Sequence, residues 1–294
     1  MKTILITGAS GFIGSNLAVL LEQDHQVICM QRKPSSGKSK STVVRGEFHA
    51  FEDLRKLDGF KIDVLVHLAA EVGGCSEEAG LATNVVGTRR LLRYLIDRGT
   101  EKFVLASSIA VPGILSNDFL PLQLPIPDDH PCLARDAYGM SKGLMEDLTK
   151  YLARANQRLD FINLRLGAVV PGDSWDPSPL DANKGPMNIP FAFLSHVQVG
   201  DVVEAIRLCV QAPLNPGVRC FNVAGPTASC DDPIPAVLRS VLGEKAKQLD
   251  MSHYDQPGHA FDPIFSTAAI RQALGFVPRL TVRPRQFLAE QKGK

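Results

Sequence analysis

The sequence lacks the marks of several protein classes. Its six cysteines form no C-x-x-C pair and no zinc-finger spacing with histidine, so neither a disulfide scaffold nor a zinc finger is expected. Polar residues interrupt every apolar run before the roughly 18–20 residues that a membrane span needs. The start, MKTILIT, has no signal-peptide pattern. We therefore expect free thiols, a cytoplasmic location and no membrane partner.

Net charge is almost absent as well. The 294 residues include 32 Lys and Arg against 31 Asp and Glu, which gives +1 with the seven His neutral. No broad positive field is available for nucleic acid, which is therefore not an expected partner. With 45% hydrophobic residues, a chain of this length buries on the order of 75% of its unfolded surface, so we expect one large domain or two unequal ones.

Short apolar runs alternate with longer helical patterns. The expected strands are Thr3–Thr7, Gln26–Met30, Val64–Leu68, Lys102–Ala106, Phe161–Leu166 and Cys220–Val223. The expected helices are Gly14–Gln23, Ala79–Arg98, Tyr138–Ala155, Val202–Gln211, Ile234–Leu242 and Ala268–Leu274. This alternation predicts the α/β class, with a Rossmann-type, doubly wound parallel sheet covered on both faces.

The alternation weakens after Val170. We expect a domain over residues 1–170 and a smaller, mainly substrate-binding portion over 171–294, with segments near 199–225 returning to the main sheet. Two stretches of loop composition interrupt the pattern. Arg32–Thr42 is rich in Ser and Lys, and Val170–Pro190 is rich in Pro, Gly, Asp and Asn.

A glycine-rich turn follows the first expected strand. Gly8, Gly11 and Gly14 are spaced three apart, and Phe12 and Ile13 lead into a helix. Bare backbone is needed at a tight turn, at the close approach of a pyrophosphate, and where a helix packs on a strand. The N-terminus of the helix favours the diphosphate charge. The turn predicts dinucleotide binding, with an incidental turn as the alternative.

The end of the second strand bears on the choice of dinucleotide. NAD-binding domains place a carboxylate there, which would repel the 2′-phosphate of NADP. Here Gln31 is neutral and is followed by Arg32 and Lys33. Arg donors match phosphate oxygens, so the pattern favours NADP(H). NAD(H), with a solvated basic loop, is the alternative.

A tyrosine and a lysine stand four residues apart at the start of an expected helix. Tyr138 and Lys142 therefore share one helix face. A tyrosine with a pKa of about 10 is a poor base, but a nearby cation favours the phenolate. The pair predicts an acid–base group, although the short Y-x-x-x-K pattern also matches by chance and depends on the glycine turn for support.

These segments resemble the extended short-chain dehydrogenase/reductase family, which includes the NAD-dependent sugar epimerases and dehydratases. Eight motifs in the family's order cover almost the whole chain. They are TGASGFIG at 7–14, His67–Ala70, Asn84–Thr88, Ser107–Ser108, Tyr138–Lys142, Val199–Ala205, Phe221–Gly225, and Leu274–Phe276 with Pro278.

The resemblance implies a small-molecule substrate and a site without metal. Tyr138 would move the hydroxyl proton, Ser108 would bond the substrate oxygen, and Lys142 would hold the nicotinamide ribose. The implied cofactor contacts beyond the glycine turn are Glu47, which would face the adenine amino group, Leu68, Ala69, Ala70, and Asn84 as structural support. The resemblance also implies a homodimer packed through Ala79–Arg98 and Tyr138–Ala155.

Several departures make a nucleotide-sugar substrate less certain. Ala168 stands where the family's epimerases usually carry Asn. Two family arginines fall at Leu194, or a near neighbour, and at Gln256. Losing two cations removes charge-assisted bonds to a diphosphate. Ile109 and Ala110 replace the acidic pair of the dehydratases, so dehydration is not expected.

Three hypotheses therefore stand. The leading one is NAD(P)-dependent hydride transfer at a ketone or secondary alcohol of a sugar-like or other polar substrate. The second is a UDP- or dTDP-hexose 4-epimerase that holds its NAD(P) through turnover. The third is a non-catalytic NADP-sensing protein, against which Ser108, Tyr138 and Lys142 argue. His67 is expected in the core. His196 and His253 are expected as surface or capping groups, with a place in the lining of the substrate cleft as the alternative.

Overall fold

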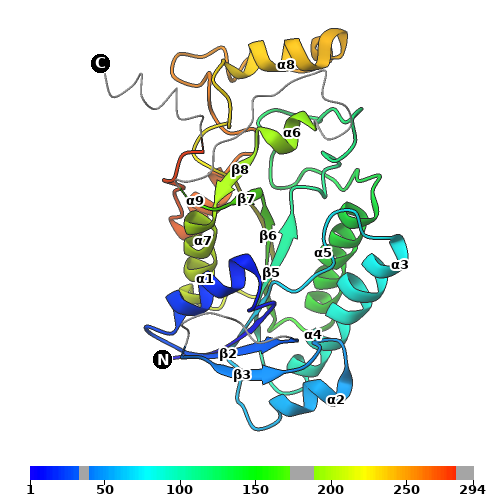
Figure 1. Cartoon of the computed structure of the whole chain (residues 1–294), viewed down its shortest axis with the longest axis vertical. Helices are drawn as coiled ribbons and strands as arrows, with labels where there is room; N and C mark the ends of the chain where they lie inside the picture. The colour runs from blue at the N-terminus through cyan, green and yellow to red at the C-terminus, as the bar shows by residue number, and fades with distance from the viewer. Residues whose placement is uncertain (33–39, 173–188, 283–294) are drawn as a thin grey trace. The chain divides into compact units, whose positions relative to one another are not determined.

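The structure is a computed structural model that describes residues 1–32, 40–172 and 189–282 (Figure 1). Its main sheet has seven strands in the order β3-β2-β1-β4-β5-β6-β9. The strands are β1 (Thr3–Thr7), β2 (Gln26–Gln31), β3 (Thr42–Arg45), β4 (Val64–His67), β5 (Lys102–Ser108), β6 (Asp160–Leu166) and β9 (Gly217–Val223). The α/β, Rossmann-type class predicted from the sequence is confirmed.

Strand pairing places the glycine turn at the end of an interior strand of the sheet. β1 pairs in parallel with β2, Thr3 opposite Gln26, and on its other side with β4, Ile4 opposite Val64. The strand order therefore reverses at β1, because the chain runs outward from β1 to β2 and β3 and then crosses back to β4 on the other side of β1. In such sheets, ligands bind outside the carboxyl ends of the strands at this reversal.

All six expected strands are present, each within three residues of its predicted bounds. Three of the helices are α1 (Phe12–Leu21), α5 (Ala137–Ala155) and α7 (Val199–Gln211), and two more, α8 (Ile234–Leu242) and α9 (Ala268–Leu274), have the predicted ends. The expected single helix Ala79–Arg98 is instead three elements. These are a short helix α3 (Glu77–Ala79), a π-helical segment η2 (Gly80–Gly87) and α4 (Thr88–Ile96).

The described ends of both expected loops belong to regular elements, and residues 33–39 and 173–188 of these stretches lie outside the described residues. Thr42 begins the edge strand β3, whose four residues include only one that is buried. Val170 ends a three-residue strand β7 (Ala168–Val170), and Pro190 begins α6 (Pro190–Phe193). β7 pairs in parallel with β8 (His196–Gln198) in a small second sheet. Short helical turns α2 (Phe51–Leu54), η1 (Arg55–Leu57) and η4 (Gly243–Gln248) complete the described elements.

The chain forms two compact units. The first comprises 1–108, 136–164 and 203–220, and the second comprises 109–135, 165–202 and 221–294. The first unit packs a core around Leu5, Leu65 and Phe103, all inaccessible to solvent. The second unit packs its own core around Phe191, Ile234 and Phe265. The division expected near residue 170 stays a prediction, since the units exchange segments on either side of it.

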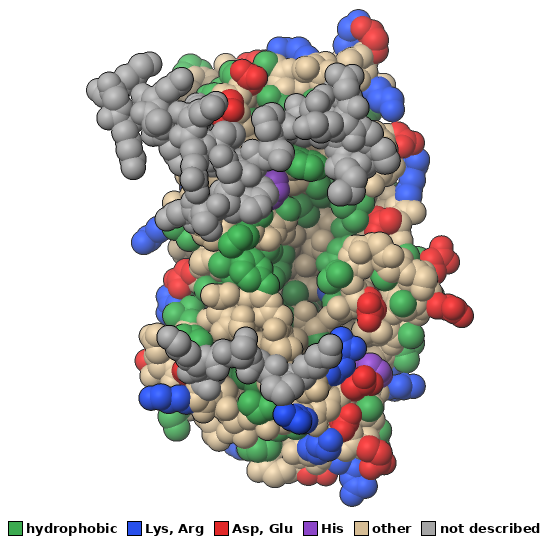
Figure 2. Space-filling model, viewed as in Figure 1, with side chains coloured by type: hydrophobic (Ala, Val, Ile, Leu, Met, Phe, Trp, Pro, Cys, Tyr) green, Lys and Arg blue, Asp and Glu red, His purple; other side chains and the backbone are tan. Residues whose placement is uncertain are grey.

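Charged side chains of both signs are interspersed on the face shown in Figure 2, in keeping with the net charge of +1. None of the helices in the described ranges is both long and apolar enough to cross a membrane. All six cysteines are free thiols, with Cys29, Cys209 and Cys230 buried and Cys132 exposed.

Candidate active site

The glycine turn at the end of β1 is closed by contacts that exclude any side chain. Gly8 has a φ of +72°, and a Cβ on it would lie 2.7 Å from the backbone nitrogen of Ala69. A Cβ on Gly14 would lie 2.3 Å from the carbonyl oxygen of Gly8. Gly11 donates its N–H to that same oxygen at 3.0 Å and occupies the N-cap of α1, where it supplies no side-chain cap. The turn therefore presents bare backbone at a helix N-terminus.

This geometry fits the diphosphate of a dinucleotide. The first turn of α1 contains no acidic residue that would compete with phosphate for the positive end of the helix. Phe12, at the start of α1, is exposed, and Ile13 is half-buried. Leu68, Ala69 and Ala70 follow β4 and are half-buried, and Leu68 donates its N–H to the carbonyl of Thr7 at 3.2 Å.

The end of β2 carries a buried amide next to this turn. Gln31 is 4% exposed, and its Oε1 has no hydrogen-bond partner among the described residues. A buried acceptor without a partner costs about 1–3 kcal/mol, which a ligand hydroxyl could recover. Arg32 is exposed, whereas Lys33 lies outside the described residues. Glu47 is half-buried, and its carboxylate pairs with His49 at 3.1 Å.

Ser108, Tyr138 and Lys142 lie together in the first unit. Ser108 ends β5, and Tyr138 is the second residue of α5, whose N-cap Asp136 accepts a hydrogen bond from Gly139 N–H at 2.8 Å. The Nζ of Lys142 is 5.8 Å from the centre of the Tyr138 ring. The fold therefore brings together the three residues that the sequence analysis named as catalytic.

Burial controls the protonation of this group. It raises the pKa of the Tyr138 phenol above its ordinary value, and hydrogen bonding with Ser108 only partly offsets the rise. The sequence analysis expected Lys142 to favour the phenolate. Instead, the Lys142 ammonium donates to the carbonyl of Ala106 at 2.7 Å, and the tyrosine holds its proton at neutral pH.

Burial also lowers the pKa of Lys142 to about 8, because the residue is only 3% exposed to solvent. The buried carboxylate of Glu146, one helical turn further along α5, opposes this shift. Ser107 donates to Glu146 Oε1 at 2.5 Å, and the thiol of Cys220 lies 3.5 Å from the same oxygen. Glu146 thus contributes to the electrostatics around Lys142, which the sequence analysis did not consider. Its i+4 spacing from Lys142 was the available signal.

Asn84 holds the π-helical segment η2 against two neighbours. Its Oδ1 accepts from the backbone N–H of Glu71 at 2.8 Å, and its Nδ2 donates to the Glu71 carbonyl and to the Ser141 hydroxyl, both at 2.9 Å. Ser141 precedes Lys142 on α5. This hydrogen bonding is consistent with the expected supporting role of Asn84.

His67 is part of the core, as expected. Its Nδ1 lies 2.6 Å from the Thr7 hydroxyl and its Nε2 lies 2.9 Å from the Thr88 hydroxyl. Burial and the nearby Lys142 charge lower the pKa of His67 to about 3, so the imidazole is neutral at physiological pH. It links β1, β4 and α4 behind the glycine turn.

In the second unit, the positions that depart from the family pattern hold no cation. Leu194 is buried, and Gln256 lies in an exposed stretch. Arg165 is buried and donates to the backbone carbonyls of Asp128 and His130, at 3.1 and 2.9 Å. Its guanidinium therefore holds the loop that precedes α5.

The reversed strand order, the glycine turn and the Ser108–Tyr138–Lys142 group define a Rossmann-type dinucleotide-binding protein. A family model described as the NAD dependent epimerase/dehydratase family matches residues 4–183. Because this match spans more than half of the sequence, the chain belongs to that family.

Two curated relatives are UDP-glucose 4-epimerases. The protein from Halalkalibacterium halodurans is 30% identical over 55% of this chain and 49% of its own length. The protein from Drosophila melanogaster is 28% identical over 67% of this chain and 61% of its own length. The aligned part of the chain thus spans about half to three fifths of these relatives.

Solved structures share the fold at low sequence identity. UDP-glucose 4-epimerase from Bifidobacterium longum, in complex with NAD+ and UDP, has a TM-score of 0.71 at 20% identity, over 95% of this chain and 94% of its own. A short-chain dehydrogenase/reductase superfamily protein from Agrobacterium tumefaciens with bound NAD has a TM-score of 0.68 at 21% identity. It covers 99% of this chain and 100% of its own.

Proposed function

We propose that the protein is an oxidoreductase that transfers a hydride between a nicotinamide dinucleotide and a ketone or secondary alcohol of a sugar-like or other polar small molecule. A bound nicotinamide supplies or accepts the hydride. The observation that carries the proposal is the placement of Ser108 and Tyr138 in hydrogen-bond contact, with Lys142 one helical turn further on.

Each residue has a role that its surroundings support. Tyr138 is protonated at neutral pH, so it can give its proton to the oxygen of a ketone as hydride arrives at carbon. Ser108 hydrogen-bonds the same oxygen and orients it. Lys142 is held by the Ala106 carbonyl, and its ammonium would hold the nicotinamide ribose of a bound dinucleotide.

Nucleotide-sugar 4-epimerisation is the second candidate, and the curated relatives favour it, because both named above are UDP-glucose 4-epimerases. In that reaction, as in oxidation of a secondary alcohol, Tyr138 must first act as a base, which its raised pKa opposes; reduction of a ketone needs it only as an acid. The absence of cations at Leu194 and Gln256 also weakens the case for a substrate diphosphate.

The two candidates differ in cofactor use. Cofactor-stripped protein is first tested for reduction of a panel of polar ketones, followed as loss of NADH or NADPH absorbance. UDP-glucose is then incubated with protein reloaded with one equivalent of dinucleotide, and UDP-galactose is sought. Ketone-dependent cofactor consumption supports the reductase, whereas UDP-galactose formed without net consumption establishes the epimerase. Neither activity, with cofactor bound, would contradict both.

For the cofactor we propose NAD(H). The unpartnered Oε1 of Gln31 is an acceptor that a ribose hydroxyl can satisfy and a 2′-phosphate cannot. The solved structures named above contain NAD. NADP(H), favoured by Arg32 and Lys33, is the alternative. Calorimetric titration with both cofactors decides between them, and Gln31→Glu is expected to strengthen selection of NAD. Tighter NADPH than NADH binding, lost in Arg32→Ala, would overturn the proposal.

We also propose a homodimer packed through η2 and α5, in a reducing compartment such as the cytoplasm. Large apolar side chains on these elements are exposed: Leu81 and Val86 on η2, and Leu144 and Tyr151 on α5. Leu144 and Tyr151 are seven residues apart and share one helix face. Light scattering should give twice the 31.9 kDa chain mass, and Leu144→Glu should halve it. A wild-type monomer at micromolar concentration would contradict the dimer.

A further inference from the structure

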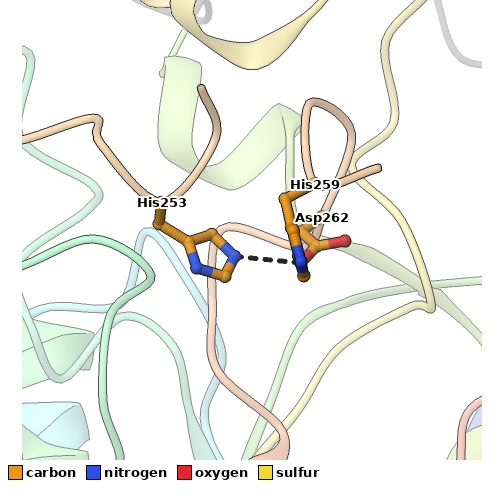
Figure 3. Close-up of side chains that lie close together, drawn as sticks. All are labelled: His253, His259 and Asp262. Carbon is orange, nitrogen blue, oxygen red and sulfur yellow. Dashed lines mark hydrogen bonds and ion pairs between the residues drawn. The ribbon is translucent and has the colours of Figure 1, made fainter. Parts of the chain in front are cut away.

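Two histidines and an aspartate converge in the second unit, which does not contain Ser108, Tyr138 or Lys142 (Figure 3). His253 Nε2 lies 2.9 Å from Asp262 Oδ2, and His259 Nδ1 lies 2.7 Å from the same oxygen. The three atoms are all within 4.8 Å of one another. The side chains are 32%, 43% and 33% exposed, so a solvated ion can reach them.

The donor set is that of a borderline divalent metal ion. Neutral imidazole nitrogens and a carboxylate oxygen bind zinc at about 2.0–2.2 Å, and three protein ligands leave one position for water. Two ligand atoms on a tetrahedral ion are then roughly 3.4 Å apart. The hydrogen-bonded atoms, now at 2.7 and 2.9 Å, need to separate by only about half an ångström to admit such an ion.

The backbone holds the three residues in place. His259 donates its N–H to the carbonyl of Gln256 at 3.1 Å, and Asp262 donates to the carbonyl of His259 at 2.9 Å. These consecutive turns bring His259 and Asp262 to the same side of the loop. The carbonyl of Phe261, next to Asp262, accepts from Ala228 N–H at 2.9 Å and ties the loop to a distant segment.

Aromatic packing sets the direction of the His253 ring. Tyr254 is 2% exposed, and its ring meets the His253 ring edge-on with centroids 5.1 Å apart. The Tyr254 hydroxyl donates to the Pro263 carbonyl at 3.2 Å, which fixes the tyrosine against the loop. The His253 and His259 ring centroids are 4.9 Å apart, with their nitrogens directed at one oxygen.

We propose that His253, His259 and Asp262 bind one divalent transition-metal ion of the zinc class, with at least one coordination position left to water. The sequence analysis predicted no metal. The spacing of these residues, H-x5-H-x2-D, indicates a metal site only once the turns between residues 256 and 262 are known. Without an ion, Asp262 Oδ2 accepts both imidazole N–H groups, and the ion would replace those two hydrogen bonds with metal bonds.

The test uses the full chain, treated with a chelator and then titrated with ZnCl2 by calorimetry. We expect one zinc ion per chain, and Co2+ bound in its place should give visible d–d absorption. His253→Gln and His259→Gln should each lose this binding. His25→Gln changes a half-buried histidine in the other unit, and the variant should bind zinc as the unaltered chain does.

Thermal unfolding separates loss of the site from loss of the fold. Zinc should raise the melting temperature of the unaltered chain and of His25→Gln, since an ion that binds only the native state stabilises it. Zinc should leave the melting temperature of the folded His253→Gln variant unchanged. If a variant does not fold, Asp262→Asn, which keeps an oxygen acceptor for the imidazoles, provides the same comparison. The proposal would be overturned if the unaltered chain showed no saturable zinc binding. It would also be overturned if a chain carrying both His253→Gln and His259→Gln still bound zinc. The three residues would then form only a hydrogen-bonded group.

Discussion

The ammonium of Lys142 donates a hydrogen bond to the carbonyl oxygen of Ala106, at 2.7 Å, from a position almost wholly removed from solvent. This bond joins the first turns of α5 to β5 two residues before Ser108. It keeps a cation beside Tyr138 even though burial lowers the lysine's pKa to about 8.

A pH-dependent effect on stability follows. Unfolded Lys142 has a pKa near 10.4, so between about pH 8 and pH 10 the unfolded chain binds more protons there than the native chain. This group's contribution to the free energy of unfolding therefore rises with pH in that window. Relative to that of Lys142→Met, the free energy of unfolding of the unaltered chain should rise by up to about 1.4 kcal/mol per pH unit.

Denaturant unfolding of both proteins from pH 7 to pH 10 measures this difference. Lys150→Met is the matched control, because Lys150 is an exposed lysine of the same helix, paired with Asp147. The Lys142→Met difference should rise with pH relative to the Lys150→Met difference. Two differences that run parallel across this range would contradict the lowered pKa of Lys142.

Tyr138→Phe should separate chemistry from binding. Removing the hydroxyl takes away the proton donor but leaves the glycine turn intact, so kcat should fall by roughly 10²–10⁴-fold with the dinucleotide Kd little changed. Single-turnover kinetics and calorimetry with NADH measure the two effects. Unchanged kcat would remove Tyr138 from the mechanism, and an equal loss of cofactor affinity would assign it to binding alone.

Gly14→Ala should weaken the cofactor site and the fold together. The new methyl group would lie 2.3 Å from the Gly8 carbonyl oxygen, which cannot move without breaking its bond to Gly11 N–H. We expect loss of detectable NADH binding and a lower melting temperature. Gly73→Ala is the control, because no atom lies within 4 Å of its added Cβ. If the two variants bound NADH equally well and melted at the same temperature, the close packing of the turn would be contradicted.

Removing one member of a buried ion cluster should strongly destabilise the first unit. Asp160 is inaccessible to solvent, pairs with Lys102 at 3.1 Å, and also pairs with Arg219. Asp160→Asn would leave two cations facing a neutral amide, at a cost of about 3–5 kcal/mol in the free energy of unfolding. Urea denaturation measures it. Asp147→Asn breaks an exposed pair and should cost less than about 1 kcal/mol. A similar loss in both variants would disprove the cluster's importance.

The strands and the closeness of Tyr138 to Lys142 could be predicted from the sequence because each rests on a local pattern, whereas the place of Ser108 came from the resemblance to a family. β1 and β4 are apolar runs with clear ends, and Tyr138 and Lys142 need only helical spacing to meet. The edge strand β3 could not be found in this way, since one of its four residues is buried and no hydrophobic pattern marks it. Edge strands depend on pairing with a neighbour more than on their own burial.

The remaining differences come from side chains that act at a distance along the chain. The expected helix Ala79–Arg98 contains a π-helical half, where the Asn84 amide pairs with the Glu71 backbone thirteen residues away. His253, His259 and Asp262 meet only because two turns fold the loop between them. Periodicity in the sequence does not report contacts between distant residues. Neither the π-helical segment nor the histidine–aspartate cluster could therefore be predicted from spacing alone.

The unequal exposure of the thiols makes this protein suited to site-selective labelling. Burial raises the pKa of Cys209 to about 12, so its reactive thiolate is scarce at neutral pH, and Cys29 and Cys230 are also buried. Cys132 is exposed and belongs to the second unit, and the half-buried Cys75 and Cys220 would first be replaced by serine. A fluorophore attached there under mild alkylation would report on that unit's response to nucleotide or metal without the introduction of a new cysteine.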